Sequence, residues 1–282
     1  MKILVLGSTG MAGHMVEKYL KLKGYDVTTV ARKNADLSIN VDSTDSVITF
    51  CDSLTEKYDF VVNCIGALVK FSNDDPAKAI LINSWFPHYL EKHFKNTKTK
   101  IIQLSTDCIF DGKEGNYNET DTPTETNMYG RSKLLGEIVN DKDITFRMSI
   151  IGPELKNGIG LLNWVLTNEN DELPGWNNAW WNGITTLQLA RCIEQYIQNP
   201  KISGLFQLTN THSSESKHRI NKYELLCLMN TVFELNKTVV ETQGPKDIDK
   251  VLINNRMDDF KFDIDESYEK ALIELKEFYF VK

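Results

Sequence analysis

Short apolar segments alternate with longer amphipathic ones along the first 210 residues. Apolar runs of four or five residues predict buried strands, and we place these near residues 3–6, 27–30, 60–64, 100–104, 144–148 and 204–208. The intervening apolar periodicity predicts helices near residues 11–23, 76–95, 128–140 and 185–198. Regular alternation of this kind is typical of a parallel sheet with helices on both faces. The pattern therefore predicts an α/β protein with a doubly wound, Rossmann-type parallel sheet.

Two segments interrupt this alternation. Residues 151–184 and 211–282 are richer in Asn, Trp and charge than the remainder. We expect them to form a smaller, mostly C-terminal lobe that binds the substrate. Residues 1–150 and 185–210 would then form the dinucleotide-binding domain. A chain of 282 residues is long enough to bury a substantial core in this arrangement.

Glycines follow the first predicted strand at intervals of three, at Gly7, Gly10 and Gly13. Between a strand and a helix, this spacing is typical of a dinucleotide site. The first glycine permits a tight turn, the second lets the backbone approach a pyrophosphate, and the third lets the helix pack closely on the strand. The helix start offers free N–H groups to the phosphates. The alternative is a glycine-rich turn that binds nothing.

A phenol and an ammonium lie four residues apart near the start of a predicted helix, at Tyr129 and Lys133. Residues with this spacing share a helix face. The pKa of a free tyrosine is about 10, and a neighbouring ammonium lowers it by favouring the phenolate. We therefore expect Lys133 to assist proton transfer by Tyr129. An isolated pair of this type more often marks only a solvated face.

A hydroxyl group supports the catalytic interpretation. Thr106 follows the predicted strand 100–104, and ligands of open α/β sheets bind beyond the carboxyl ends of the strands. The alternative is that Thr106 merely caps a turn. A hydroxyl, a phenol and an ammonium in this order form a set suited to reducing a carbonyl group.

The end of the second predicted strand indicates the type of cofactor. NAD-binding proteins usually carry Asp or Glu there, which holds the ribose 2′-hydroxyl, whereas a 2′-phosphate requires cations. This chain has Arg32 and Lys33 at that position, and Asp26 lies at the opposite end of the strand. We therefore predict NADP, with NADPH preferred over NADH, unless both cations are simply exposed.

These motifs together resemble the extended short-chain dehydrogenase/reductase family. The glycine turn, Asn63, the run from Ser105 to Gly112 and the run from Tyr129 to Glu137 carry the resemblance. Within that family, they look most like the dTDP-4-dehydrorhamnose reductase type. The resemblance implies an NADP(H)-dependent oxidoreductase that reduces the 4-keto group of a nucleotide-activated 6-deoxyhexose. Such a reaction would serve the biosynthesis of a surface-polysaccharide sugar.

The resemblance also implies roles for individual residues. Tyr129 would donate the proton, Thr106 would donate to the substrate oxygen, and Lys133 would also bind the nicotinamide ribose. Asp42 would approach the adenine. The predicted cofactor contacts are Gly7, Ser8, Thr9, Gly10, Met11, Ala12, Gly13, Arg32, Asp42, Asn63, Cys64, Ile65, Gly66, Tyr129 and Lys133. The predicted substrate contacts are Thr106, Asp107, Cys108, Trp164 and Trp176. Both tryptophans could stack on a base or a sugar, and core packing is the equal alternative.

Three related functions can be compared with the residues present. The 4,6-dehydratases carry Thr-Asp-Glu, and Cys108 occupies the place of their Glu, so dehydration lacks its base. Cys108 also resembles the epimerising thiol of the GDP-fucose synthase type. That type needs a histidine after the Tyr/Lys motif, and none occurs between His93 and His212. A non-catalytic, NADP-binding regulatory subunit is the third alternative, although such proteins tend to lose the Tyr/Lys pair.

Composition limits the partners and the cellular compartment that we expect for the protein. A net charge of −7 argues against broad nucleic-acid binding. The five cysteines are scattered without metal-binding spacing, which predicts reduced thiols, no bound metal and a cytoplasmic protein. We expect neither an N-terminal leader nor a membrane span, because no apolar run approaches the roughly 20 residues required. The expected partner is a nucleotide-diphosphate sugar, and a homodimer remains open.

Overall fold

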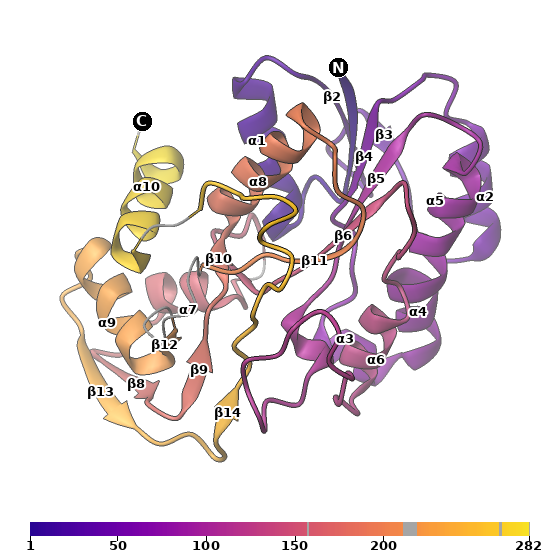
Figure 1. Ribbon diagram of the computed structural model, residues 1–282. Helices are drawn as coiled ribbons and strands as arrows, with labels where there is room; N and C mark the ends of the chain where they lie inside the picture. Colours follow the sequence, from indigo (N-terminus) through magenta and orange to yellow (C-terminus); the bar gives the residue numbers. More distant parts are fainter. Residues whose placement is uncertain (157, 211–218, 265–266, 282) are drawn as a thin grey trace.

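A seven-stranded sheet, in which all neighbouring strands are parallel, forms the centre of the molecule (Figure 1). The computed structural model describes residues 1–156, 158–210, 219–264 and 267–281. In spatial order, the strands are β11 (Gly204–Gln207), β6 (Ile144–Arg147), β5 (Lys100–Leu104), β4 (Phe60–Asn63), β1 (Lys2–Leu6), β2 (Asp26–Ala31) and β3 (Leu37–Ser38). The predicted doubly wound parallel sheet is confirmed.

Alternation along each strand supplies two layers of core. In β1, Ile3 and Val5 belong to one buried cluster, and Leu4 and Leu6 belong to the other. Helices α1 (Met11–Leu22) and α8 (Thr186–Gln198) cover the first face, and α2 (Thr44–Asp52) and α5 (Phe86–Phe94) cover the second (Figure 1). Side chains of successive strand residues point to opposite faces, so an unbroken apolar run is what a strand buried on both sides requires.

The predicted helix 76–95 is wrong as a continuous α-helix. It consists of α4 (Pro76–Ile80), a π-helical turn η1 (Leu81–Trp85) and α5. The N–H of Phe86 donates to the carbonyl of Leu81, five residues back. Pro87 follows and has no N–H to donate, so the regular ladder is interrupted here. A short helix α3 (Val69–Asp74) and helix α2 were not predicted.

The predicted helix 128–140 is also shorter than expected. Helix α6 spans Met128–Leu134, and the N–H of Gly136 closes a turn on the carbonyl of Lys133. Gly136 lies against the π-helical turn, because an added Cβ there would stand 1.8 Å from the carbonyl oxygen of Asn83. The end of α6 is therefore fixed by packing against the neighbouring helix.

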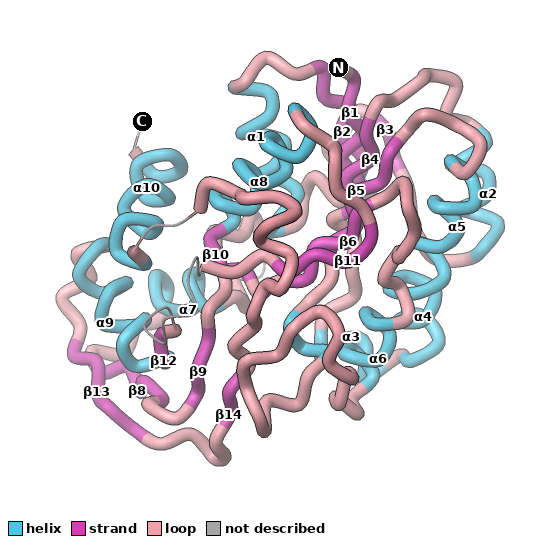
Figure 2. Tube along the Cα trace, viewed as in Figure 1, coloured by secondary structure: helices cyan, strands magenta, loops and turns pink. Residues whose placement is uncertain are grey.

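Short paired strands and three helices lie beside the main sheet. Strand β8 (Glu172–Trp176) pairs with β13 (Thr238–Thr242), and β9 (Ala179–Trp181) lies between β12 (Ile220–Asn221) and β14 (Ile248–Asp249). Strand β7 (Ile150–Ile151) pairs with β10 (Ile184–Thr185). Helices α7 (Leu161–Thr167), α9 (Lys222–Val232) and α10 (Tyr268–Phe280) complete this region, which we call the lobe (Figure 2).

The lobe shares its core with the main sheet. Leu173, Met229 and Leu275 of the lobe belong to the same buried cluster as Ile3 and Val5. The two regions therefore do not have separate hydrophobic cores. Their division into a cofactor domain and a substrate lobe stays a prediction about binding.

The segment after β14 returns along the outer edge of β11. The side chain of Asn254 donates to the carbonyl of Gln207 at 2.8 Å. Arg256 Nη1 donates to the carbonyls of Ser203 and Leu205 at 2.8 and 2.7 Å. Side chains thus occupy acceptors that this edge strand leaves unpaired within the sheet.

Among the described residues, no helix combines the length and hydrophobicity that crossing a membrane requires.

Candidate active site

The glycine-rich turn connects β1 to α1. Gly7 adopts a φ of 79°, and an added Cβ would stand 3.0 Å from the backbone of Cys64. Gly13 has no room for a side chain, because a Cβ there would stand 2.1 Å from the carbonyl oxygen of Gly7. Helix α1 begins at Met11 without a side-chain cap. Its first N–H groups therefore remain available to an anion, as the predicted dinucleotide site requires.

The turn also contacts the end of β2. The N–H groups of Gly7 and Ser8 both donate to the carbonyl of Val30, at 2.8 and 3.1 Å. Arg32 follows two residues later with an exposed side chain. Asp42 is exposed as well, and its carboxylate forms an ion pair with Lys78. Arg32 thus stands just beyond the strand whose end touches the glycine turn.

The end of β4 forms a further part of the predicted cofactor wall. The buried side chain of Asn63 donates to Gln103 Oε1 at 2.8 Å and accepts from the N–H of Ile65 at 3.2 Å. Asn63 therefore shapes the strand end through contacts within the protein. Burial raises the pKa of the Cys64 thiol to about 12. An added Cβ on Gly66 would lie 3.9 Å from Lys133 Nζ, which places this loop beside α6, the candidate catalytic helix.

Lys133 points into the protein from α6. Its Nζ donates to the carbonyl of Leu104 at 2.6 Å, and the residue is only 7% exposed. Burial lowers the pKa of Lys133 to about 8, against the opposing charge of Glu137. The ammonium therefore stands directly behind the end of β5, from which Thr106 follows.

Tyr129 shares α6 with Lys133, but the expected effect of Lys133 on its pKa is wrong for this arrangement. Burial raises the pKa of Tyr129, the Cys108 thiol acts in the same direction, and a hydrogen bond with Thr106 opposes them. Lys133 is not among the groups that shift this pKa, because its ammonium is directed to the carbonyl of Leu104. The phenol consequently holds its proton throughout the neutral pH range.

Thr106 both caps a turn and meets the tyrosine. It precedes a single 3₁₀ turn, η2 (Asp107–Ile109), and its Oγ1 accepts from the N–H of Cys108 at 3.1 Å. The same hydroxyl donates to Asp107 Oδ1 at 3.2 Å. The capping alternative and the contact with Tyr129 are therefore compatible, since the cap fixes where the hydroxyl lies.

Asp107 and Cys108 are the next residues along this loop. Burial raises the pKa of Asp107, and the charge of Lys250 opposes that shift. Burial also raises the pKa of Cys108 to about 12, with the Asp107 charge acting in the same direction. At neutral pH, Cys108 is therefore a protonated thiol.

Asn83 is a site residue that the sequence analysis missed. It lies in the π-helical turn and is buried. Its Oδ1 accepts from the N–H of Ala67 at 2.7 Å, and its Nδ2 donates to the Ala67 carbonyl at 3.1 Å and to Ser132 Oγ at 3.0 Å. Asn83 thus joins the loop after β4 to the catalytic helix. The available signal was Pro87, four residues later inside a predicted helix, since π-turns are frequent at functional sites.

A buried ion pair behind the catalytic helix was missed as well. Arg147 Nε and Nη2 donate to the two carboxylate oxygens of Glu137 at 3.1 and 2.8 Å. Ser105 Oγ donates to Glu137 Oε1 at 2.6 Å. The signal was an arginine inside an otherwise apolar strand, where a charge requires a partner. This network holds the end of α6 against the residue that precedes Thr106.

The two predicted substrate tryptophans occupy different environments. Trp164, on α7, packs against the main hydrophobic cluster. Trp176 ends β8, and Lys222 Nζ lies 4.6 Å from the centroid of its ring. The structure therefore brings Trp176 to a charged surface and Trp164 to the core. A part in substrate binding stays a prediction for both.

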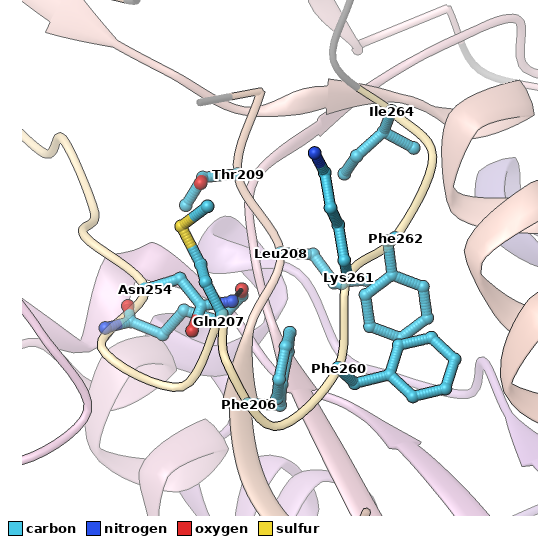
Figure 3. A pocket seen from close by; sticks show the side chains of 10 residues that line it. Phe206, Gln207, Leu208, Thr209, Asn254, Phe260, Lys261, Phe262 and Ile264 are labelled. Atoms are coloured by element: carbon cyan, nitrogen blue, oxygen red, sulfur yellow. Dashed lines mark hydrogen bonds between the residues drawn. The ribbon is translucent and has the colours of Figure 1, made fainter. Parts of the chain in front are cut away.

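A small hollow lies at the edge of the sheet, away from these residues (Figure 3). It measures about 20 Å³ and is lined by β11 and the segment 254–264, including Phe206, Gln207, Thr209, Asn254, Lys261 and Phe262. This volume suits one water molecule. None of Thr106, Tyr129 and Lys133 lines the hollow. Among the described residues, no group of three or more His, Cys, Asp or Glu side chains could hold a metal ion.

Comparisons with known proteins agree with this arrangement. The chain is 29% identical over 226 residues to a dTDP-4-dehydrorhamnose reductase from Burkholderia thailandensis, covering 74% of this chain and 73% of that protein. It is 22% identical over 251 residues to the methionine adenosyltransferase 2 subunit beta of Xenopus tropicalis, covering 83% and 72%. A solved dTDP-4-dehydrorhamnose reductase from Bacillus anthracis, in complex with NADP, superposes with a TM-score of 0.81. The identity to that structure is 17%, and the alignment covers 97% of this chain and 98% of the other.

A family model provides the assignment. The model described as RmlD substrate binding domain matches residues 1–225, which is most of the chain. The match contains the glycine turn, the loop at Thr106 and the whole of α6. The protein therefore belongs to the RmlD substrate-binding domain family, with the fold of the extended short-chain dehydrogenases/reductases.

Proposed function

We propose that the protein reduces the 4-keto group of a nucleotide-activated 6-deoxyhexose with NADPH, in the biosynthesis of a surface-polysaccharide sugar. The observation that carries the proposal is the grouping of Thr106, Tyr129 and Lys133 at the carboxyl end of β5. That is the edge of the sheet where an open α/β protein binds its ligands. The protein is an oxidoreductase, and its relatives carry that activity in their names.

The residues of this chain divide the reaction between them. NADPH supplies the hydride that reaches the carbonyl carbon. Tyr129 donates its proton to the developing alkoxide, and a raised pKa keeps that proton in place until the oxygen becomes basic. Thr106 supplies a second donor to the same oxygen. Preorganised donors at a developing oxyanion are commonly worth a few kcal/mol each. Lys133 would hold the nicotinamide ribose, from its place behind the end of β5.

NADPH fits the cofactor wall described above. The uncapped start of α1 would take the pyrophosphate, and Arg32 would pair with the 2′-phosphate. Asp42 would approach the adenine, and the loop of Asn63, Cys64, Ile65 and Gly66 would pass beside the cofactor. The glycine turn from Gly7 to Gly13 carries no charge, and Arg32 is exposed. Both features favour a cofactor with a 2′-phosphate over one with a free 2′-hydroxyl.

The substrate side of the proposal involves the loop after β5 and the lobe. Asp107 and Cys108 would line the sugar, and Trp176 would lie beside the nucleotide sugar. We place the reaction in the cytoplasm, where NADPH and nucleotide sugars are available, and we retain a homodimer as the candidate assembly.

The experiment is a panel of dTDP-, UDP- and GDP-linked 4-ketosugars, with the absorbance of NADPH followed and the product identified. Oxidation of NADPH by none of them would contradict the proposal.

The regulatory alternative has one specific observation in its favour, the similarity to the subunit from Xenopus tropicalis. NADPH binding without turnover of any ketosugar would support that role. The geometry favours catalysis, because Tyr129, Lys133 and Thr106 are all present and adjoin one another.

The epimerising alternative requires Cys108 to act as a base. A thiol with a pKa of about 12 is a poor base at neutral pH. Running the reaction in heavy water separates the two chemistries. Deuterium at a carbon next to the original ketone, lost in Cys108→Ser, would establish epimerisation. Reduction alone leaves those carbons unlabelled, and Cys108→Ser then retains most of the activity.

A further inference from the structure

Lys222 is a cation of the lobe that the proposed reaction has not used. It is the first residue of α9, and its Nζ lies 4.6 Å from the centroid of the Trp176 ring, a cation–π contact. Its side chain is half-buried. The ion pairs recorded around it, within the described parts of the chain, involve Arg219 and Lys250 and not Lys222.

Lys222 is linked to the loop after β5, which we call the catalytic loop. The preceding residue, Asn221, pairs with Trp180, and the N–H of Lys250 donates to the Trp180 carbonyl at 3.3 Å. Lys250 forms an ion pair with Glu125, whose N–H donates to the carbonyl of Ile109 in η2 at 2.9 Å.

Burial lowers the pKa of Lys222, electrostatic interactions with Cys108 and Asp107 oppose that shift, and Lys250 adds to it. Cys108 and Asp107 directly follow Thr106 in the η2 turn. Lys222 therefore extends from the lobe to within electrostatic reach of the residues beside the proposed reaction centre.

Two neighbouring cations differ from Lys222 in one respect. Arg219 lies 4.2 Å from the centroid of the Trp180 ring, and its Nη1 is 2.7 Å from Asp249 Oδ2. Lys250 Nζ lies 3.6 Å from Glu125 Oε2. Each of these charges is balanced by a carboxylate. Lys222 has an aromatic face beneath it and lacks such a partner among the described residues.

Close packing of β8 against α9 fixes the position of Lys222. An added Cβ on Gly175 would stand 2.7 Å from Tyr223 Cα, so β8 and the first turn of α9 are in direct contact. Asn221 caps the same turn by accepting from the N–H of Glu224, whose side chain accepts from Asn221 in return. Trp176 and Lys222 are thereby held in register, one at the end of β8 and the other at the start of α9.

An ammonium in this position needs an anion. Removing a charge from water is unfavourable unless an opposite charge or hydrogen bonds compensate for it. A cation–π contact compensates only in part. Burial accordingly lowers the pKa of Lys222, and an anion beside it would restore the charged form. The nucleotide-sugar substrate carries anionic oxygens and would reach this surface from the catalytic loop.

We propose that Lys222, seated on Trp176, binds an anionic oxygen of the substrate next to the catalytic loop. The oxygen belongs to the diphosphate of the nucleotide, since a 6-deoxyhexose carries no carboxylate. This inference rests on the proposed function, since it assumes a nucleotide-sugar substrate. It makes Lys222 a determinant of substrate affinity that comes from the lobe.

The test uses the full chain loaded with NADPH. Binding of dTDP, UDP and GDP, and of the three matching nucleosides, is measured by calorimetry for wild type, Lys222→Met and Lys222→Arg. Lys246→Met, which removes an exposed lysine of the same lobe, is the matched control. Loss of a charge-assisted hydrogen bond should weaken the diphosphate that binds wild type by about tenfold or more in Lys222→Met. Nucleoside and NADPH affinities should be unchanged, and Lys222→Arg should recover part of the loss.

A second comparison identifies the source of the anion. UDP-glucose and UDP-glucuronate differ only at C6 of the sugar, which is a carboxylate in the second, so a loss confined to glucuronate in Lys222→Met would overturn the assignment to the diphosphate. Equal weakening of both, together with UDP, assigns it to the diphosphate. Unchanged affinity for every anionic probe overturns the inference, and so does an equal loss for the uncharged nucleosides, which would indicate a structural role. If wild type binds none of the nucleotides and reduces no ketosugar, the proposed function itself fails.

Discussion

Burial acts in opposite directions on Tyr129 and Lys133 of α6. It raises the pKa of Tyr129 and lowers that of Lys133, so both side chains are biased toward their uncharged forms. The phenol is thereby kept as a proton donor. The ammonium is left close to its titration point, where pH controls its charge.

Tyr129→Phe removes the proton donor and keeps the ring. We expect turnover to fall by about a hundredfold or more, because general acid catalysis is typically worth that much. NADPH affinity should stay within about twofold of wild type. Steady-state kinetics and cofactor titration provide the measurement. A variant that kept more than about a tenth of the wild-type rate would remove Tyr129 from its role.

The pH dependence of activity and of NADPH affinity should reflect the ionisation of Lys133. Its pKa of about 8 means that the ammonium is charged below that pH and becomes neutral as the pH rises through it. Activity and NADPH affinity should therefore both decline above pH 8, since the proposed contact of the ammonium with the nicotinamide ribose weakens. The measurements are kcat/KM and the NADPH Kd between pH 6.5 and 9.5. Lys133→Met should lack this limb, and a limb that persisted there would belong to another group.

Arg32 determines the cofactor if it pairs with the 2′-phosphate. Arg32→Ala should raise the Kd for NADPH about tenfold, because a charge-assisted hydrogen bond is lost, and should leave the Kd for NADH nearly unchanged. Lys33→Ala is the matched control, one residue further along the same exposed loop. Equal losses for both cofactors in Arg32→Ala would exclude the pairing.

At the scale of elements, the interrupted helix 76–94 shows that a hydrophobic pattern can predict a helix but not a π-turn within it. The apolar spacing along this segment is helical throughout, and it correctly predicted that a helix exists. The shift to a π-turn depends on Pro87 and on the close approach of Gly136 to Asn83, which lies on another element. Such a shift moves Asn83 toward Ala67 and Ser132. No local signal places those groups together.

Asn83→Ala should test that arrangement. The backbone of Ala67 and the hydroxyl of Ser132 would lose buried partners, and an unsatisfied buried polar group costs roughly 1–3 kcal/mol. We expect a decrease of that size in the free energy of unfolding, measured with urea. Asn96→Ala, at an exposed position just beyond α5, should change it by less than about 0.5 kcal/mol. Similar values for the two variants would show that Asn83 is not a structural link.

At the scale of the whole molecule, the central sheet was predictable and the lobe was not. Six of the seven central strands are mostly buried, so an apolar run identifies each of them without knowledge of its neighbours. The edge strand β3 is only partly buried and was not predicted. The strands of the lobe are two to five residues long and pair across long separations, as β8 does with β13. Runs of that length carry little periodicity. The contact of Lys222 with Trp176 depends on those pairings, and the sequence alone did not reveal it.

The segment that returns along β11 also covers an edge of the sheet at which another molecule could otherwise add a strand. An open strand at the edge of a sheet is a template for intermolecular pairing and aggregation. At one edge, Asn254 and Arg256 occupy the carbonyls of Ser203, Leu205 and Gln207. At the other edge, β3 is only two residues long. Both ends of the sheet are thus poor templates for an added strand.

Arg256→Ala should therefore leave the outer edge of β11 open to pairing with a strand of another molecule. We expect light scattering on mild heating to rise faster than in wild type when the two are compared at the same fraction unfolded, because strand addition becomes available to folded molecules. Arg256→Lys retains a donor and should lie between them. If all three proteins scatter alike, the guanidinium contributes to packing alone. Dispersal of the protein would then depend on its net charge of −7 and not on the protection of this strand.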